Sequence, residues 1–154
     1  MKNGLLAALA LLATPPAANA QTLGPTGIAA AILQAYTARD VAAIAAHTNE
    51  TNADFFAALI TGQEDPAELF GGSRGAAGTG WNGKMLPARF NGRGHAIVPF
   101  AIEAETGPAG LGSGAAGRYM AIVLTLDGPQ DTSWGFEDIN YIRRGDYAGM
   151  ATTR

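Results

Sequence analysis

The acidic side chains that lie close to aromatic residues in the sequence are the ones that could do acid–base chemistry. Asp40 follows Tyr36 at a short spacing, Glu103 interrupts an apolar run, and Asp138 lies among aromatic residues. A carboxylate that faces a tyrosine can serve as the general base of an isomerase, a dehydratase or a hydrolase. The tyrosines that could complete such a pair are Tyr36, Tyr119 and Tyr141.

Two of these carboxylates also have structural explanations that require no ligand. Asp40 is a preferred residue type for a helix N-cap, because its carboxylate accepts hydrogen bonds from free backbone N–H groups. Glu103 marks a site if it faces inward, whereas solvent explains it if it lies near the end of a strand. We therefore expect Asp40 to cap a helix, and the sequence assigns no catalytic residue.

Residues 133–147 combine large aromatic side chains with charges, a mixture that is common at binding surfaces. Strand alternation would place Trp134, Phe136 and Asp138 on one face of a strand. The opposite face would then carry Glu137, Ile139 and Tyr141. Asp138 could also serve a structural role by pairing with an arginine. The candidate ligand-binding residues of the whole chain are Tyr36, Glu103, Tyr119, Trp134, Phe136 and Asp138.

The segments that could carry metal, nucleophile or phosphate chemistry lack the sequence context that such chemistry requires. Its two histidines, His47 and His95, are far apart, and no HxxxH, HxH or HExxH is present. Residues 71–75 (GGSRG) fit the letters of G-x-S-x-G around Ser73, but this segment is a Gly-rich stretch and no strand pattern precedes it. Residues 78–84 (GTGWNGK) match the start of a P-loop, but Met85 replaces the Ser or Thr that would hold magnesium, and a strand pattern follows instead of a helix. We expect no metal and no cofactor.

Residues 1–20 have the features of a cleavable signal peptide. Lys2 supplies a positive start, residues 5–13 form a short apolar run, and Ala18 and Ala20 fit the small-x-small pattern before a cleavage site. The apolar run is shorter than the roughly 20 residues that cross a membrane. We therefore expect cleavage after Ala20, a periplasmic or secreted protein, and no membrane association of the mature chain.

Composition limits the partners and the size of the fold. Residues 21–154 are enough for a single domain with its own core. The chain has no cysteine, which excludes disulfides and thiol chemistry. A formal net charge of −3, with Arg143 and Arg144 as the only adjacent basic pair, argues against nucleic acid as a partner.

Helical patterns fill the first half of the mature chain. Residues 28–47 carry an apolar stripe through Ile28, Ile32 and Tyr36, and the break before Asp40 divides this segment into two helices. No strand pattern separates the second helix from the next one.

Two shorter helices are predicted after this pair. Thr51 and Asp54 match a capping box, which predicts a third helix that ends at Gly62. Asp65 is the expected cap of a fourth helix that begins at Pro66.

The second half of the chain predicts strands. Residues 71–80 (GGSRGAAGTG) predict a loop, because their composition favours no regular structure. The period then becomes alternating, which predicts four strands, joined by hairpin loops that include residues 107–117 and 127–131. The strands are expected at about residues 84–90, 96–105, 118–126 and 132–141. We therefore expect an α+β fold in which the N-terminal helices pack on one face of a four-stranded antiparallel meander.

The helix pair, with the sequence AYTARDVAAIAAH at its centre, resembles the opening helices of the NTF2-like superfamily. That superfamily includes ketosteroid isomerase, SnoaL-type cyclases and exported bacterial domains of unknown function. Its members typically place an aromatic residue, small residues, an Asp and an Ala/Leu-rich second helix before a curved antiparallel sheet. The resemblance implies an NTF2-like cone whose concave face can hold a small apolar molecule, in a superfamily where many members catalyse nothing.

These features together predict an exported, non-catalytic domain. Its partner would be a small apolar molecule or another protein, and a homodimer is left open. The alternative is a small-molecule isomerase, dehydratase or hydrolase that uses an Asp or Glu base beside a Tyr.

Overall fold

A computed structural model describes residues 23–103, 117–128 and 133–154 of the chain. The predicted signal peptide lies outside the described residues, as do residues 107–116 of one predicted loop and residues 129–131 of the other. No helix within the described ranges is long and apolar enough to cross a membrane.

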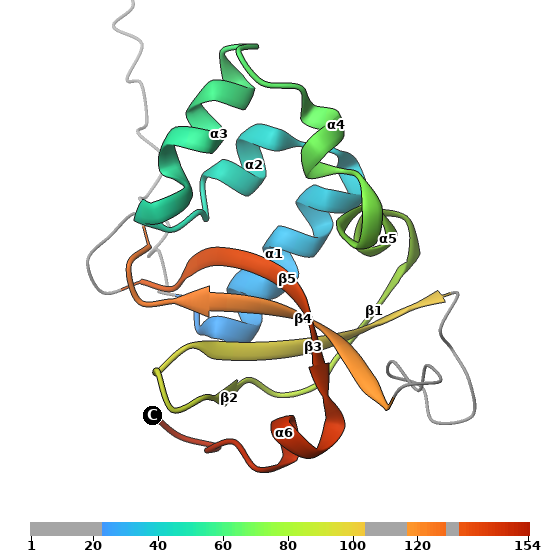
Figure 1. The fold of residues 1–154 in the computed structure, drawn as a ribbon, viewed down its shortest axis with the longest axis vertical. Coiled ribbons are helices and arrows are strands. Elements are labelled where there is room, and N and C mark those ends of the chain that lie inside the picture. Colours follow the sequence, from blue (N-terminus) through green and yellow to red (C-terminus); the bar gives the residue numbers. More distant parts are fainter. Residues whose placement is uncertain (1–22, 104–116, 129–132) are drawn as a thin grey trace, which may run out of the picture.

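The described chain folds as helices followed by an antiparallel sheet (Figure 1), so the α+β prediction is confirmed. The helices of the first half are α1 (Pro25–Ala38), α2 (Val41–Ala45), the 3-10 helix η1 (Glu50–Asn52), α3 (Ala53–Ile60), α4 (Pro66–Leu69) and α5 (Gly72–Gly80). The remaining elements are β1 (Trp81–Met85), β2 (Arg89–Phe90), β3 (Ala96–Ile102), β4 (Arg118–Thr125), β5 (Gly135–Arg143) and α6 (Arg144–Ala148).

The sheet has five strands. Four of them follow the order β1-β3-β4-β5, and the short strand β2 pairs with the same edge of β3 as β1 does. All strand pairs are antiparallel, and β4 lies between β3 and β5 with apolar residues on both of its faces. The expectation of four strands was wrong, because the predicted strand at residues 84–90 forms two short strands. Pro99 explains the division: its carbonyl accepts a hydrogen bond from the Leu86 N–H at 2.8 Å, but it has no N–H to donate in return.

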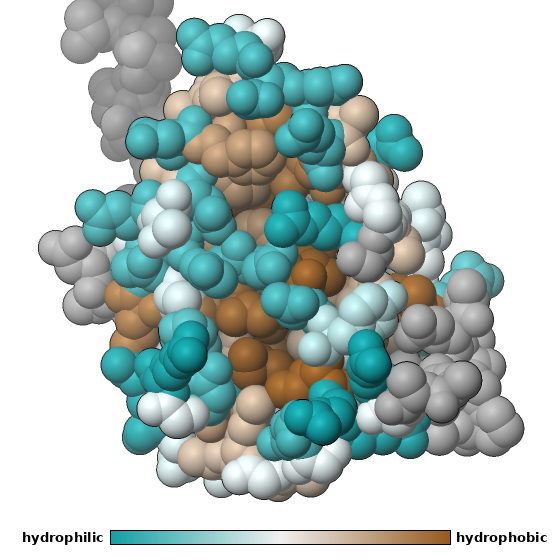
Figure 2. Space-filling view, viewed as in Figure 1, coloured by the Kyte–Doolittle hydropathy of each residue, from teal (hydrophilic) through white to brown (hydrophobic). Residues whose placement is uncertain are grey.

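The main core lies between α1 and the sheet. The predicted stripe of Ile28, Ile32 and Tyr36 is buried, and α1 contacts β1, β3, β4 and β5. A smaller core on the other face of the sheet joins Ile97 and Ala121 to Tyr147 of α6. Figure 2 shows hydrophobic side chains gathered around the sheet on the lower part of the visible face.

The break between α1 and α2 follows the local chemistry of Arg39 and Asp40. Arg39 ends α1 in the left-handed conformation, with φ 53°. Asp40 then caps α2, because its carboxylate accepts a hydrogen bond from the Ala43 N–H at 2.9 Å. The predicted cap is therefore confirmed, and this carboxylate is used at a helix start.

The two following helices form where they were predicted, with one change in capping. Asp65 caps α4 by accepting a hydrogen bond from the Ala67 N–H at 2.8 Å. The capping box of Thr51 was wrong: Asn49 caps the 3-10 turn η1, and α3 continues from that turn without a side-chain cap.

The Gly-rich segment predicted as a loop is helix α5, which packs on α1. Its glycines allow close approach of the two helices, since a Cβ on Gly78 would lie 2.9 Å from the Tyr36 carbonyl oxygen. Packing of this kind outweighs a weak intrinsic helix propensity.

A bulge in β5 overturns the predicted division of its faces. Val123 pairs with Asp138 and Leu124 with Phe136, so Glu137 is an extra residue in the strand. The alternation therefore shifts by one position, and Phe136 and Ile139 both belong to the core beneath α1.

Candidate functional site

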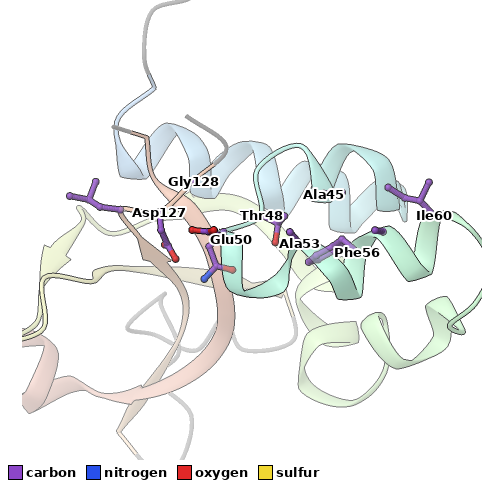
Figure 3. A pocket seen from close by; sticks show the side chains of 11 residues that line it. Ala45, Thr48, Glu50, Ala53, Phe56, Ile60, Asp127 and Gly128 are labelled. Carbon is purple, nitrogen blue, oxygen red and sulfur yellow. The ribbon is translucent and has the colours of Figure 1, made fainter. Parts of the chain in front are cut away.

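A pocket of about 630 Å³ lies between the helical layer and the end of β4 (Figure 3). Its walls come from α2, the turn after α2, η1, α3 and the residues that follow β4. The lining residues are Ala45, Thr48, Asn49, Glu50, Ala53, Phe56, Ala57, Ile60, Leu126, Asp127 and Gly128.

The pocket is apolar along its length and acidic at one end. Figure 3 shows Glu50 and Asp127 at one end and Ile60 at the other, with Phe56 between them. Ile60 is 57% exposed although it is a large apolar residue, so this end offers hydrophobic surface to a ligand. Within the part of the chain that the structure describes, the lining contains no basic side chain.

Two oxygen atoms in the pocket wall are buried without a hydrogen-bond partner among the described residues. They are the Oγ1 atom of Thr48 and the Oδ1 atom of Asp127. The whole Thr48 residue is only 8% exposed. Buried polar atoms are usually satisfied, and an unpaired one costs free energy, so a small shift that opens these two atoms to the pocket would let a ligand donor pair with them.

The turn after α2 is held in place by backbone hydrogen bonds to β5 and to the residues after β4. The Phe136 N–H donates to the His47 carbonyl at 2.6 Å, and the Asn49 N–H donates to the Phe136 carbonyl at 3.1 Å. The Glu50 N–H donates to the Asp127 carbonyl at 3.0 Å. Thr48 thereby forms a parallel bridge with Phe136, and both acidic residues of the pocket are fixed on one frame.

The side chain of Asn49 strengthens this frame from inside. Asn49 is only 1% exposed. Its Nδ2 group donates to the Thr125 hydroxyl at 3.2 Å and to the Glu137 carboxylate. Its Oδ1 atom accepts a hydrogen bond from the Asn52 N–H at 3.0 Å, which caps η1. One side chain therefore ties the pocket wall to β4, β5 and η1.

Three of the predicted ligand-binding residues come together outside the lining of this pocket. The ring of Tyr36 meets the ring of Phe136 edge-to-face at 6.0 Å. Asp138 lies close enough to affect Tyr36 electrostatically, and it pairs with Arg74 of α5 at 2.7 Å. This contact is the structural role that was the alternative explanation for Asp138.

Tyr36 is an unusual member of this cluster. Its hydroxyl oxygen is buried without a hydrogen-bond partner among the described residues. Burial raises the pKa of Tyr36 well above its ordinary value, while the Arg74 guanidinium opposes this and Asp138 adds to it. The hydroxyl therefore stays protonated at any physiological pH and is unsuited to act as a base.

The other three predicted ligand-binding residues are scattered. Tyr119 lies on the second face of the sheet, where its ring meets Tyr147 at 5.6 Å. The ring of Trp134 packs against Phe90 at 5.7 Å. Glu103 is exposed just beyond the end of β3. The six predicted ligand-binding residues therefore do not form one site in the structure.

The histidines take no part in a metal site among the described residues, where no group of three or more His, Cys, Asp or Glu side chains could hold an ion. His47 lies in the turn after α2, and burial lowers the pKa of its imidazole. His95 directly precedes β3.

Sequence reasoning missed the pocket because its polar residues occupy turns. Thr48, Asn49 and Glu50 fall between the second and third predicted helices, and Asp127 begins a predicted hairpin loop. Turns that a rigid scaffold positions often carry function, but which turns meet in space depends on long-range pairing. Thr48 and Phe136 are far apart in the sequence, so no local pattern predicts the bridge between them.

Comparisons with known proteins leave the geometry as the basis for any functional conclusion. A scan of protein-family models and searches of curated proteins and solved structures returned no match to this chain.

Proposed function

We propose that the chain is an exported, non-catalytic domain of NTF2-like type that binds a small amphiphile in the pocket between α2, α3 and the end of β4. The amphiphile has an apolar body and a positively charged, hydrogen-bond-donating head. The apolar body lies along Phe56 and Ile60, and the head lies between Glu50 and Asp127.

The observation that carries the proposal is the pair of unpartnered oxygen atoms at the acidic end of the pocket. Thr48 Oγ1 and Asp127 Oδ1 are acceptors, and a protonated amine offers three donors. The carboxylates of Glu50 and Asp127 favour a cation over a neutral or anionic head, because the pocket walls exclude part of the screening water.

The size of the pocket supports a small organic molecule as the ligand. Its volume of about 630 Å³ lies within the roughly 300–1,000 Å³ typical of small-molecule sites. Its small alanine side chains, Ala45, Ala53 and Ala57, leave room for an alkyl chain between the helices.

The assignment to an NTF2-like type draws on the order of elements. The helix pair precedes an antiparallel sheet, and the bridge at Thr48 provides a minimal strand between the second and third helices, where the sequence pattern suggested none. Export draws on the signal-like residues 1–20.

The test is a titration of the purified protein with three probes of equal chain length: octylamine, 1-octanol and octanoate. NMR chemical shifts of labelled protein report both affinity and location. We expect saturable binding of octylamine, weaker binding of octanol and the weakest binding of octanoate. Equal affinity for all three probes, or tightest binding of octanoate, would contradict the cationic head.

A matched pair of variants separates the pocket acid from general surface charge. Asp127→Asn removes one charge at the pocket, and Asp54→Asn removes one from the exposed first turn of α3, outside the pocket lining. We expect Asp127→Asn to weaken octylamine about tenfold, the loss of one charge-assisted hydrogen bond, and Asp54→Asn to change affinity less than about twofold.

A further inference from the structure

A second pocket, of about 410 Å³, lies on the sheet face opposite α1. It is formed by the residues between β1 and β2, by β4 and by α6. Its lining combines apolar residues with two tyrosines and two arginines, and includes Leu86, Pro87, Arg89, Tyr119, Arg144 and Tyr147. No carboxylate lines it in the part of the chain that the structure describes, so its charge is positive.

The two arginines are used differently. Arg89 already has partners within the protein. Its Nη1 group donates to the Ala148 carbonyl at 2.7 Å, and its guanidinium lies 4.9 Å from the centre of the Tyr147 ring. Arg144 stacks 5.2 Å from the centre of the Tyr119 ring. The Nε and Nη2 atoms of Arg144 are buried and have no hydrogen-bond partner among the described residues.

These two atoms of Arg144 are the ones that matter for recognition. Nε–H and Nη2–H lie side by side on one edge of the guanidinium plane and form the fork that binds a carboxylate through two parallel hydrogen bonds. A guanidinium that is removed from water without an acceptor costs free energy, which an anion in the pocket would offset.

We propose that this pocket binds a small organic carboxylate: the Arg144 side chain turns its shielded fork into the pocket to hold the carboxylate, and the organic part lies against Leu86, Pro87 and the two tyrosines. The charge of Arg89 adds to the attraction while its position stays fixed by the carbonyls of α6. The apolar and aromatic lining distinguishes an organic acid from a free inorganic anion, which would leave that surface in contact with water.

The site is independent of the amphiphile pocket. The two pockets share no lining residue, and they carry opposite charges. Failure of one proposal therefore leaves the other unaffected.

The experiment is an NMR titration of the purified protein at pH 7 with benzoate, benzamide and inorganic phosphate. Benzamide has nearly the same shape as benzoate but carries no charge. We expect saturable shifts at the amides of Tyr119, Arg144 and Tyr147 with benzoate, and at least about tenfold weaker binding of benzamide. Equal affinity for the two, no saturable binding of benzoate, or binding of phosphate alone would overturn the proposal.

Two adjacent arginines provide the matched variants. Arg144→Gln removes the fork, and Arg143→Gln removes an exposed guanidinium that pairs with Asp146 outside this pocket. We expect Arg144→Gln to weaken benzoate at least about tenfold and Arg143→Gln to change its affinity by less than about twofold. Equal effects of the two would overturn the proposal. Arg144→Lys keeps the charge but loses the fork, and it gives the same test if the glutamine variant does not fold.

Discussion

Gly135 and Asn49 approach one another so closely that a Cβ atom on Gly135 would lie 2.7 Å from the Cα atom of Asn49. The same Cβ would lie 2.8 Å from the Cα atom of Gly128, which lines the amphiphile pocket. The start of β5 is therefore packed directly against two walls of the pocket. Glycine is required at this position by contact, because its φ is not among the positive values of the chain.

This contact predicts the effect of Gly135→Ala. The added methyl group must displace the turn that carries Asn49, so we expect a loss of about 1–3 kcal/mol in the free energy of unfolding and weaker octylamine binding. Urea denaturation measures the first and titration the second. Gly145→Ala is the control, since nothing lies within 4 Å of its Cβ and it lies in a helix, where alanine is favoured by about 0.5–1 kcal/mol. Equal effects of the two variants would contradict the packing argument.

Thr48→Val separates stability from binding. The Thr48 hydroxyl is buried without a partner among the described residues, and valine has nearly the same shape. We expect the free energy of unfolding to stay within about 1 kcal/mol of wild type or to rise, because an unsatisfied polar group is removed. Octylamine affinity should fall at the same time. If both stability and affinity fall together, the hydroxyl is satisfied within the fold and has no role for the ligand.

Tyr36 offers a similar contrast within the core. We expect Tyr36→Phe to leave stability unchanged or to raise it by up to about 1 kcal/mol, since its buried hydroxyl has no partner among the described residues. Tyr36→Ala should cost about 3–5 kcal/mol, because it removes a ring that packs against Phe70 and Phe136. Calorimetric unfolding measures both. A loss of several kcal/mol in the phenylalanine variant would show that the hydroxyl is engaged.

The pH dependence of stability should depend in part on His47. Burial lowers the pKa of this imidazole below its ordinary value of about 6.5, so folding favours its neutral form. Its stabilising contribution is therefore present above the ordinary pKa and is lost as the pH falls below it. We expect the urea midpoint to decrease as the pH is lowered from 7.5 to 5.5. The decrease should be less steep in His47→Gln. His95→Gln is the control, and an unchanged slope in the His47 variant would contradict the assignment.

Local patterns were enough to predict much of the helical layer. The stripe of Ile28, Ile32 and Tyr36, the break at Asp40 and the cap at Asp65 are confirmed, because each depends on residues within a few positions of one another. The central strand β4 was predicted for the same reason, since its apolar alternation is continuous.

Features that depend on distant contacts were not predictable. Helix α5 forms from a Gly-rich segment because α1 lies against it, and the split of β1 from β2 occurs opposite Pro99. The bulge at Glu137 moves Ile139 onto the core face, which alternation alone had placed opposite Phe136. The pocket could not be predicted for the same reason. Thr48 and Asp127 come together only because the turn after α2 pairs with β5.

The most direct test of the central claim is to locate octylamine on the protein by intermolecular NOEs and to repeat the titration with Ala57→Trp, which fills the pocket. Ala42→Trp is the control, because Ala42 is exposed on α2 and does not line the pocket. We predict NOEs from the alkyl chain to Phe56 and Ile60, loss of binding in Ala57→Trp and retained binding in Ala42→Trp. Unchanged binding in Ala57→Trp, or NOEs confined to other parts of the protein, would contradict the account.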